Sequence, residues 1–163
     1  VLDGGPCTVG IESTIVDCSR QTPVILRPGH IAPAHLAEVL GFAPEIETAE
    51  GAPRVPGALP AHYAPNTPLR LLTPAELERM LDAGRRVALL AHTSAMAACL
   101  DRLPEDCRKL LSDDPVVYAH DLYAALRALD SCGAECIALE QTPQTPVWSA
   151  INDRLRRALA GSV

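Results

Sequence analysis

The chain has no apolar run long enough to cross a membrane and no excess of basic residues. No stretch approaches the roughly 18 consecutive apolar residues of a membrane-spanning helix, and no charged-then-apolar N-terminus indicates a secretion signal. The 20 acidic residues outnumber the 14 basic ones and give a net charge of −6, which disfavours nonspecific contact with nucleic acid. We therefore expect a cytoplasmic protein without membrane association, in which any contact with RNA is local.

Cys-x-x-Cys pairs are also missing, although the chain has six cysteines. Cytosolic cysteines usually stay reduced, so buried thiols are expected rather than a disulfide framework. A zinc site could be imagined from Cys132, Cys136 and His120, but this spacing fits no usual ligand pattern. Residues 132–136 are better explained as the end of a helix and the start of a strand, and no metal ligand is assigned.

The Gly-rich phosphate-binding loops G-x-G-x-x-G and G-x-x-x-x-G-K-S/T are absent after every predicted strand. His92, Thr93 and Ser94 follow one strand and could hold an anion at a helix N-terminus. A capping role for Thr93 or Ser94 and a solvated turn position for His92 explain the same residues better.

Polar and charged residues near the C-terminus are likewise interpreted as an exposed, charged helical face. They are Asn152, Asp153, Arg154, Arg156 and Arg157.

What the second half of the chain does contain is an alternation of strand and helix patterns. Strands are predicted at 69–72, 86–91, 116–118 and 136–139, and helices at 74–83, 94–100, 121–131 and 146–160. Thr73, Pro74 and Glu76 form the start signature of the first helix. Repeated β-then-α units imply a mainly parallel sheet with helices on its faces, so the fold class is α/β with a Rossmann-like three-layer domain.

Two short β-branched runs near the N-terminus, within residues 10–17 and 24–29, predict further strands because Gly, Pro or Asp borders each run. Ser13, Thr14 and Arg27 would lie at the ends of these strands. From the residues alone, the two hydroxyls fit cross-strand packing and Arg27 fits a surface ion pair. A binding role for them stays open.

Residues 54–65, with the sequence RVPGALPAHYAP, form a proline-rich segment. Proline fixes φ and restricts the residue before it, so we expect an extended strap rather than a helix or a flexible Gly/Ser-rich linker. His62 and Tyr63 are its only side chains that offer both a ring and a polar tip. Such a strap could close a site built elsewhere in the protein.

These three motifs, in this order, resemble the end of the catalytic domain and the interdomain linker of the long, two-domain threonylcarbamoyl-AMP synthases, whose catalytic domain is YrdC-like. The resemblance implies a YrdC-like remnant at 1–48, a linker strap at 49–67 and a Rossmann-like accessory domain at 68–163. Residues 148–158 resemble the last helix of the family. The family's Lys-x-Arg and Ser-x-Asn stretches and an initiator methionine have no counterpart here, so a C-terminal fragment that is inactive alone is expected.

Enzymes of this family condense L-threonine, bicarbonate and ATP into threonylcarbamoyl-adenylate. A downstream threonylcarbamoyl-transferase complex then modifies an adenosine beside the tRNA anticodon, so the link to tRNA is indirect. The resemblance implies that Ser13 contacts threonine, that Arg27 binds the ATP phosphates, and that His62 and Tyr63 cover the nucleotide. It also implies Mg²⁺ accompanying ATP, without a protein ligand or a catalytic residue assigned in this chain.

Two other interpretations of the accessory domain stay open. It could be a nucleotide-sensing or partner-docking module of the tRNA-modification machinery, or a purely structural domain that holds the strap across the catalytic domain. In some relatives, basic residues precede the His-Tyr pair of the strap, whereas Leu59, Pro60 and Ala61 fill that place here. The covering role would therefore fall mainly to His62 and Tyr63.

Overall fold

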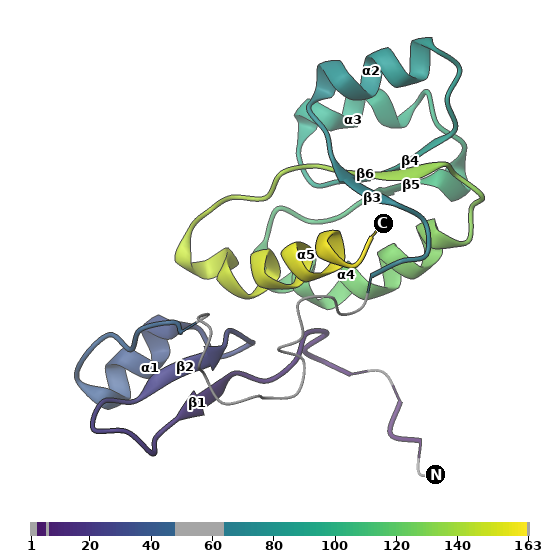
Figure 1. The fold of residues 1–163 in the computed structure, drawn as a ribbon. Helices are drawn as coiled ribbons and strands as arrows, with labels where there is room; N and C mark the ends of the chain where they lie inside the picture. The colour runs from purple at the N-terminus through teal and green to yellow at the C-terminus, as the bar shows by residue number, and fades with distance from the viewer. Residues whose placement is uncertain (1–2, 6, 48–63, 163) are drawn as a thin grey trace.

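The computed structural model describes residues 3–5, 7–47 and 64–162 (Figure 1). In the N-terminal part, strands β1 (Ile15–Asp17) and β2 (Val24–Arg27) form a two-stranded antiparallel sheet, which confirms the two predicted strands. Helix α1 (Pro33–Leu40) follows and was not predicted. Its ends do carry a signal: Pro33 occupies the first turn, and Gly41 ends the helix with φ = 77°, the usual placement of these two residues.

The C-terminal part is built on a four-stranded parallel sheet with strand order β3-β6-β4-β5. The strands are β3 (Leu69–Leu71), β4 (Val87–Ala91), β5 (Arg108–Leu110) and β6 (Cys136–Leu139). The helices are α2 (Pro74–Asp82), α3 (Ser94–Leu100), α4 (Pro115–Asp130) and α5 (Ser149–Ala160), with 3₁₀ turns at Glu105–Cys107 and Pro146–Trp148.

The sheet lies between two helical layers, with α2 and α3 on one face and α4 and α5 on the other (Figure 1). Side chains of β4 alternate between two apolar clusters: Leu89 packs with α2 and α3, whereas Leu90 packs with α4 and α5. All five residues of β4 are buried, which explains its continuous apolar sequence, since a parallel sheet is covered on both faces. The predicted α/β, three-layer architecture is confirmed.

The strand predicted at 116–118 is wrong, because these residues form the first turn of α4. The β-branched pair Val116-Val117 favours a strand, but Asp114 caps the helix and Pro115 occupies its first turn. The Asp114 carboxylate accepts hydrogen bonds from the backbone N–H groups of Val116 and Val117 at 2.8 and 3.1 Å. The strand in this part of the sheet is instead β5, an edge strand. Its Arg-Lys sequence lacks the apolar pattern by which a strand is predicted.

Helix starts were otherwise well marked in the sequence. Thr73 and Glu76 form the predicted capping box of α2, in which each side chain satisfies a backbone N–H group of the other residue. Helix α3 has the predicted bounds. The predicted closing helix at 146–160 opens with the 3₁₀ turn before it becomes α5.

Within the described ranges, no helix combines the length and apolarity needed to span a bilayer. All six cysteines are free, and four of them are buried: Cys99, Cys107, Cys132 and Cys136. Burial, helped by a hydrogen bond with Cys132, raises the pKa of Cys107 to about 12. In the part of the chain that the structure describes, no group of three or more His, Cys, Asp or Glu residues could hold a metal ion.

Asp130, the last residue of α4, binds the backbone of the residues that precede β3. Its carboxylate accepts hydrogen bonds from the backbone N–H of Asn66 at 3.1 Å and from that of Thr67 at 2.7 Å. Burial raises the pKa of Asp130, but the hydrogen bonds from Thr67 and Asn66 together outweigh it, so the net pKa lies below the ordinary 3.8. The ionised form of Asp130 is therefore the one that stabilises the fold.

A group with a lowered folded-state pKa contributes stability above its unfolded pKa, and this stability is lost as the pH falls through the folded pKa. Asp130→Asn should therefore lower the free energy of unfolding at pH 7, and the difference from the parent chain should shrink below pH 3.8. Urea unfolding at a series of pH values measures this. Asp113→Asn is the control, because Asp113 makes no hydrogen bond or ion pair within the described residues. A difference that stays constant with pH would show that the charge of Asp130 is not its source.

Candidate functional site

The candidate site lies where the loop before β1 meets the loop after β2. The backbone N–H of His30 donates to the Glu12 carbonyl at 3.3 Å. A Cβ atom at Gly29 would lie 2.3 Å from the Thr14 nitrogen and 2.5 Å from the Glu12 oxygen, closer than backbone atoms tolerate. Glycine is therefore required after Arg27-Pro28 so that the two loops can approach each other.

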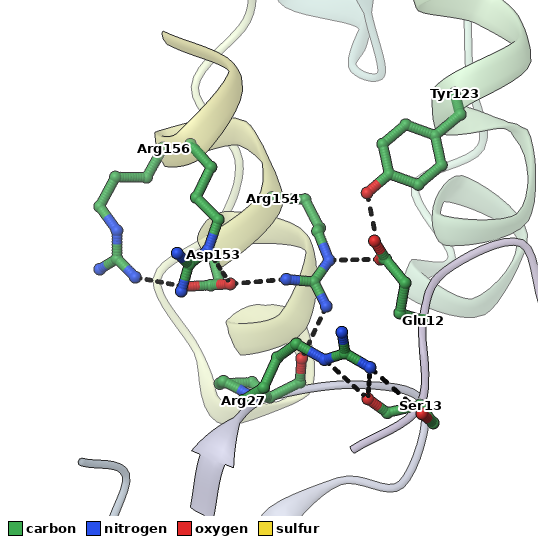
Figure 2. Close-up of polar contacts among 9 residues, drawn as sticks. Glu12, Ser13, Arg27, Tyr123, Asp153, Arg154 and Arg156 are labelled. Atoms are coloured by element: carbon green, nitrogen blue, oxygen red, sulfur yellow. Dashed lines mark hydrogen bonds and ion pairs between the residues drawn. The ribbon is translucent and has the colours of Figure 1, made fainter. Parts of the chain in front are cut away.

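This approach brings Ser13 and Arg27, the two predicted binding residues, into direct contact (Figure 2). The Arg27 Nε and Nη2 groups donate to the Ser13 carbonyl at 3.1 and 2.9 Å, and Nη2 also lies 3.2 Å from the Ser13 hydroxyl. Arg27 is 6% exposed, whereas Ser13 is on the surface. The structure thus presents a hydroxyl at the surface with a guanidinium directly behind it.

The two simpler interpretations of these residues are wrong. Arg27 is 6% exposed and donates to the Ser13 carbonyl, so it is a buried residue and not a surface one. Ser13 and Thr14 precede β1, so their hydroxyls are not packed across strands. The Thr14 Oγ1 atom instead donates to the Ile31 carbonyl at 2.8 Å and accepts from the Ile31 N–H at 3.1 Å. His62 and Tyr63, the predicted nucleotide-covering pair, lie outside the described residues.

A second arginine, Arg154 of α5, reaches both loops from the C-terminal part (Figure 2). Its side chain is 2% exposed. Nε donates to Glu12 Oε2 at 2.6 Å, Nη2 donates to the Pro28 carbonyl at 3.3 Å, and Nη1 donates to Asp153 Oδ2 at 2.8 Å. One guanidinium therefore holds the residue before Ser13 and the residue after Arg27.

Asp153 is the anionic centre of this cluster. Its carboxylate is almost fully buried and accepts hydrogen bonds from Arg154 and Arg157, each at 2.8 Å, and from Arg156. The prediction that these charges form an exposed helical face is wrong for Asp153 and Arg154, because the N-terminal segment covers that part of α5. The three arginines are thus paired with carboxylates of the chain itself.

Helix α4 also contacts the loop before Ser13. The Tyr123 hydroxyl donates to Glu12 Oε2 at 3.2 Å. Gly10 has φ = 80°, and a Cβ atom there would lie 2.2 Å from the His120 Cα, so the backbone of the N-terminal segment rests directly on α4. These contacts fix the segment against two helices of the C-terminal part.

The carboxyl ends of the parallel strands form a different pocket of about 290 Å³, lined in part by Thr73, Met96 and Glu140. An open α/β sheet usually binds its ligand at such ends. Here the Glu140 carboxylate accepts the backbone N–H groups of His92 and Thr93 at 2.7 and 3.0 Å. An internal carboxylate therefore takes the donors that a phosphate group would need.

His92 was predicted to be a solvated turn residue, and this is wrong. It is 6% exposed, and its ring lies 5.7 Å from the ring of Tyr118 and 5.6 Å from that of Trp148. The predicted cap is confirmed at Thr93, whose hydroxyl accepts from the Ala95 N–H at 3.2 Å. A histidine at a strand end gave no sign in the sequence that two aromatic rings would enclose it.

Replacing Asp153 by asparagine should destabilise the protein strongly, because three arginines then lose their shared anion and Glu12 is the one carboxylate left to the buried Arg154. Removing one partner of a buried ion pair typically costs about 3–5 kcal/mol. Arg156→Gln is the matched control: its side chain is 64% exposed and bonds the same carboxylate, so a loss of at most about 1 kcal/mol is expected. Urea unfolding of both variants checks this, and equal losses would contradict the central role of Asp153.

Comparison with known proteins places the chain in a family. The model of the family described as "Threonylcarbamoyl-AMP synthase, C-terminal domain" matches residues 31–160. Threonylcarbamoyl-AMP synthase of Bacillus subtilis (strain 168) is 31% identical over 172 residues, an alignment that covers 100% of this chain and 49% of the relative. The chain spans about half the length of the curated relatives it matches.

Two solved structures have a similar fold. The crystal structure of P. abyssi Sua5 complexed with L-threonine has a TM-score of 0.76 and 24% identity, covering 98% of this chain and 49% of the other. A variant of P. abyssi Sua5, in which a histidine and the adjacent tyrosine are replaced by alanine, has a TM-score of 0.78 and 23% identity, covering 98% and 48%. These two structures share the fold, and the family-model match over residues 31–160 shows that the chain belongs to the threonylcarbamoyl-AMP synthase C-terminal domain family.

Proposed function

We propose that this chain is the C-terminal part of a threonylcarbamoyl-AMP synthase, which makes L-threonylcarbamoyladenylate from L-threonine, bicarbonate and ATP. The observation that carries the proposal is the direct contact between Ser13 and Arg27. Because we propose that Ser13 binds threonine and that Arg27 binds the ATP phosphates, their contact would bring the two substrates together. The alignment of the Bacillus subtilis synthase along the whole chain supports this proposal.

The reaction needs positioning and charge neutralisation more than proton transfer. The threonine amine and bicarbonate form a carbamate with loss of water, and a carbamate oxygen then replaces pyrophosphate on the α-phosphorus of ATP. In this scheme the exposed Ser13 hydroxyl hydrogen-bonds L-threonine. The crystal structure of P. abyssi Sua5 complexed with L-threonine supports this amino acid as a substrate. Arg27 places a positive charge near the phosphates, and its charge-assisted hydrogen bonds to them would be stronger than bonds between neutral groups.

Magnesium would arrive with ATP as part of the substrate. This chain is proposed to contribute the positive charge of Arg27 to the binding of the Mg²⁺–ATP complex. The remaining neutralisation of the triphosphate would come from other parts of the intact synthase.

The adenylate would be passed to a downstream threonylcarbamoyl-transferase complex that modifies an adenosine beside the tRNA anticodon. The net charge of −6 and the pairing of Arg154, Arg156 and Arg157 with Asp153 support an indirect link to tRNA. The Glu140 carboxylate at the strand ends disfavours the alternative of a nucleotide-sensing accessory domain, because it occupies the available backbone donors.

The assay for the proposed function is pyrophosphate release that depends on ATP, L-threonine and bicarbonate. The intact synthase should be active, and the 163-residue chain alone should be inactive. Arg27→Ala in the intact synthase should weaken ATP binding by about 1.5–3 kcal/mol through loss of a charge-assisted contact. Arg20→Ala is the control, since Arg20 is exposed and pairs with Asp17 and Glu47. Turnover by the isolated chain, or no activity of the intact protein, would refute the proposal.

The strap is proposed to close over bound nucleotide and keep water away from the reactive acyl-adenylate. In the intact synthase, the double variant His62→Ala and Tyr63→Ala should release and hydrolyse the intermediate faster and bind ATP more weakly. Arg27→Ala is the contrasting variant, because it should weaken ATP binding without increasing the loss of intermediate. Chromatographic measurement of retained threonylcarbamoyl-adenylate distinguishes the two. If the double variant retains it as well as the parent does, the strap acts only as a spacer.

A further inference from the structure

We propose that Arg154, which belongs to the C-terminal part, is a positioning residue for threonine binding in the N-terminal part. It holds Glu12 and Pro28, the chain neighbours of Ser13 and Arg27, and so sets where the Ser13 hydroxyl lies. This inference rests on the proposed function, in which Ser13 binds L-threonine. It adds a role for the C-terminal domain in substrate affinity.

Arg154 bonds both the loop before β1 and the loop after β2. Its Nε group bonds Glu12 Oε2 at 2.6 Å, and its Nη2 group bonds the Pro28 carbonyl at 3.3 Å. Glu12 is one residue from Ser13, and Pro28 is one residue from Arg27. A shift of the Arg154 guanidinium therefore moves both loops that form the Ser13–Arg27 contact.

The guanidinium is itself fixed in orientation. Nη1 bonds the buried Asp153 carboxylate at 2.8 Å, and Asp153 is bonded in turn by Arg156 and Arg157. The Arg154 side chain is 2% exposed, so another rotamer would have to give up these bonds without gaining contact with water. A planar arginine guanidinium with partners in three directions holds those partners in fixed positions more strictly than the flexible ammonium group of a lysine does.

Glu12 is held from a second helix as well, because the Tyr123 hydroxyl reaches the same Oε2 atom at 3.2 Å. The loop before Ser13 is thus fixed by α4 and α5 together. A displacement of about 1 Å in a binding group is enough to weaken a site markedly. By linkage, L-threonine should in turn strengthen the docking of the C-terminal part on these loops.

The test uses the intact synthase and the dissociation constant of L-threonine, measured by calorimetry at a temperature where circular dichroism shows every variant folded. Arg154→Lys keeps the charge beside Asp153 but cannot keep all three partners, and it should raise the dissociation constant about ten-fold. Arg156→Lys is the matched control on the same helix and the same carboxylate, and it should change the constant less than two-fold. Equal constants for Arg154→Lys and the parent would overturn the inference.

A double-mutant cycle separates positioning from general structural damage. In a Ser13→Ala background, the group that Arg154 positions is gone, so Arg154→Lys should change the dissociation constant less than three-fold. A ten-fold effect in both backgrounds would overturn the inference, as would Ser13→Ala binding L-threonine like the parent. Should Arg154→Lys not fold, Glu12→Gln alters the same contact from the loop side, and the same two outcomes apply to it.

The same measurements distinguish failure of the proposed function from failure of the positioning role. An intact parent protein that neither binds L-threonine nor releases pyrophosphate would refute the synthase assignment itself. An active parent whose threonine affinity is indifferent to Arg154 and Glu12 would leave that assignment standing and refute only the positioning role.

Discussion

Arg154 carries a positive charge into a position that is 2% exposed, and a buried charge is tolerated only where carboxylates and hydrogen bonds surround it. Asp153, the preceding residue, supplies one carboxylate, and Glu12, 142 positions away in sequence, supplies the other. Neither the loop before β1 nor helix α5 can move away without leaving this charge partly unpaired. The mutual position of the two parts of the chain depends on this requirement.

The parallel sheet helps Arg154 to meet its partners, because the sheet fixes α4 and α5 side by side on one face (Figure 1). Tyr123 and Arg154 come from these two helices and converge on the same Glu12 oxygen. The C-terminal part thus contacts the proposed site through side chains of these two helices. The Glu140 carboxylate at its strand ends is consistent with this structural role.

Local features of the sequence predicted most of the C-terminal fold. Strands β4 and β6 are apolar runs buried in the sheet, and the cap at Thr73 depends only on residues three positions apart. The errors arose where two local signals disagreed or where the signal was weak. Val116-Val117 favoured a strand, although Asp114 and Pro115 already marked a helix start, and β5 is a charged edge strand that apolar patterns do not detect.

The site could be predicted only in part for the same reason. Ser13 and Arg27 lie in recognisable motifs, but the spacing of Asp153, Arg154 and Arg157 along α5 is the same for an exposed charged face as for a buried cluster. The distant contacts of Arg154 with Glu12 and Pro28 decide between these two. An apolar contact in that place would let the loops slide over α5. The Arg154 guanidinium instead bonds two carboxylates and a carbonyl, each in a fixed direction. The polar character of this contact therefore specifies the orientation of the loops, which burial of apolar area alone would leave free.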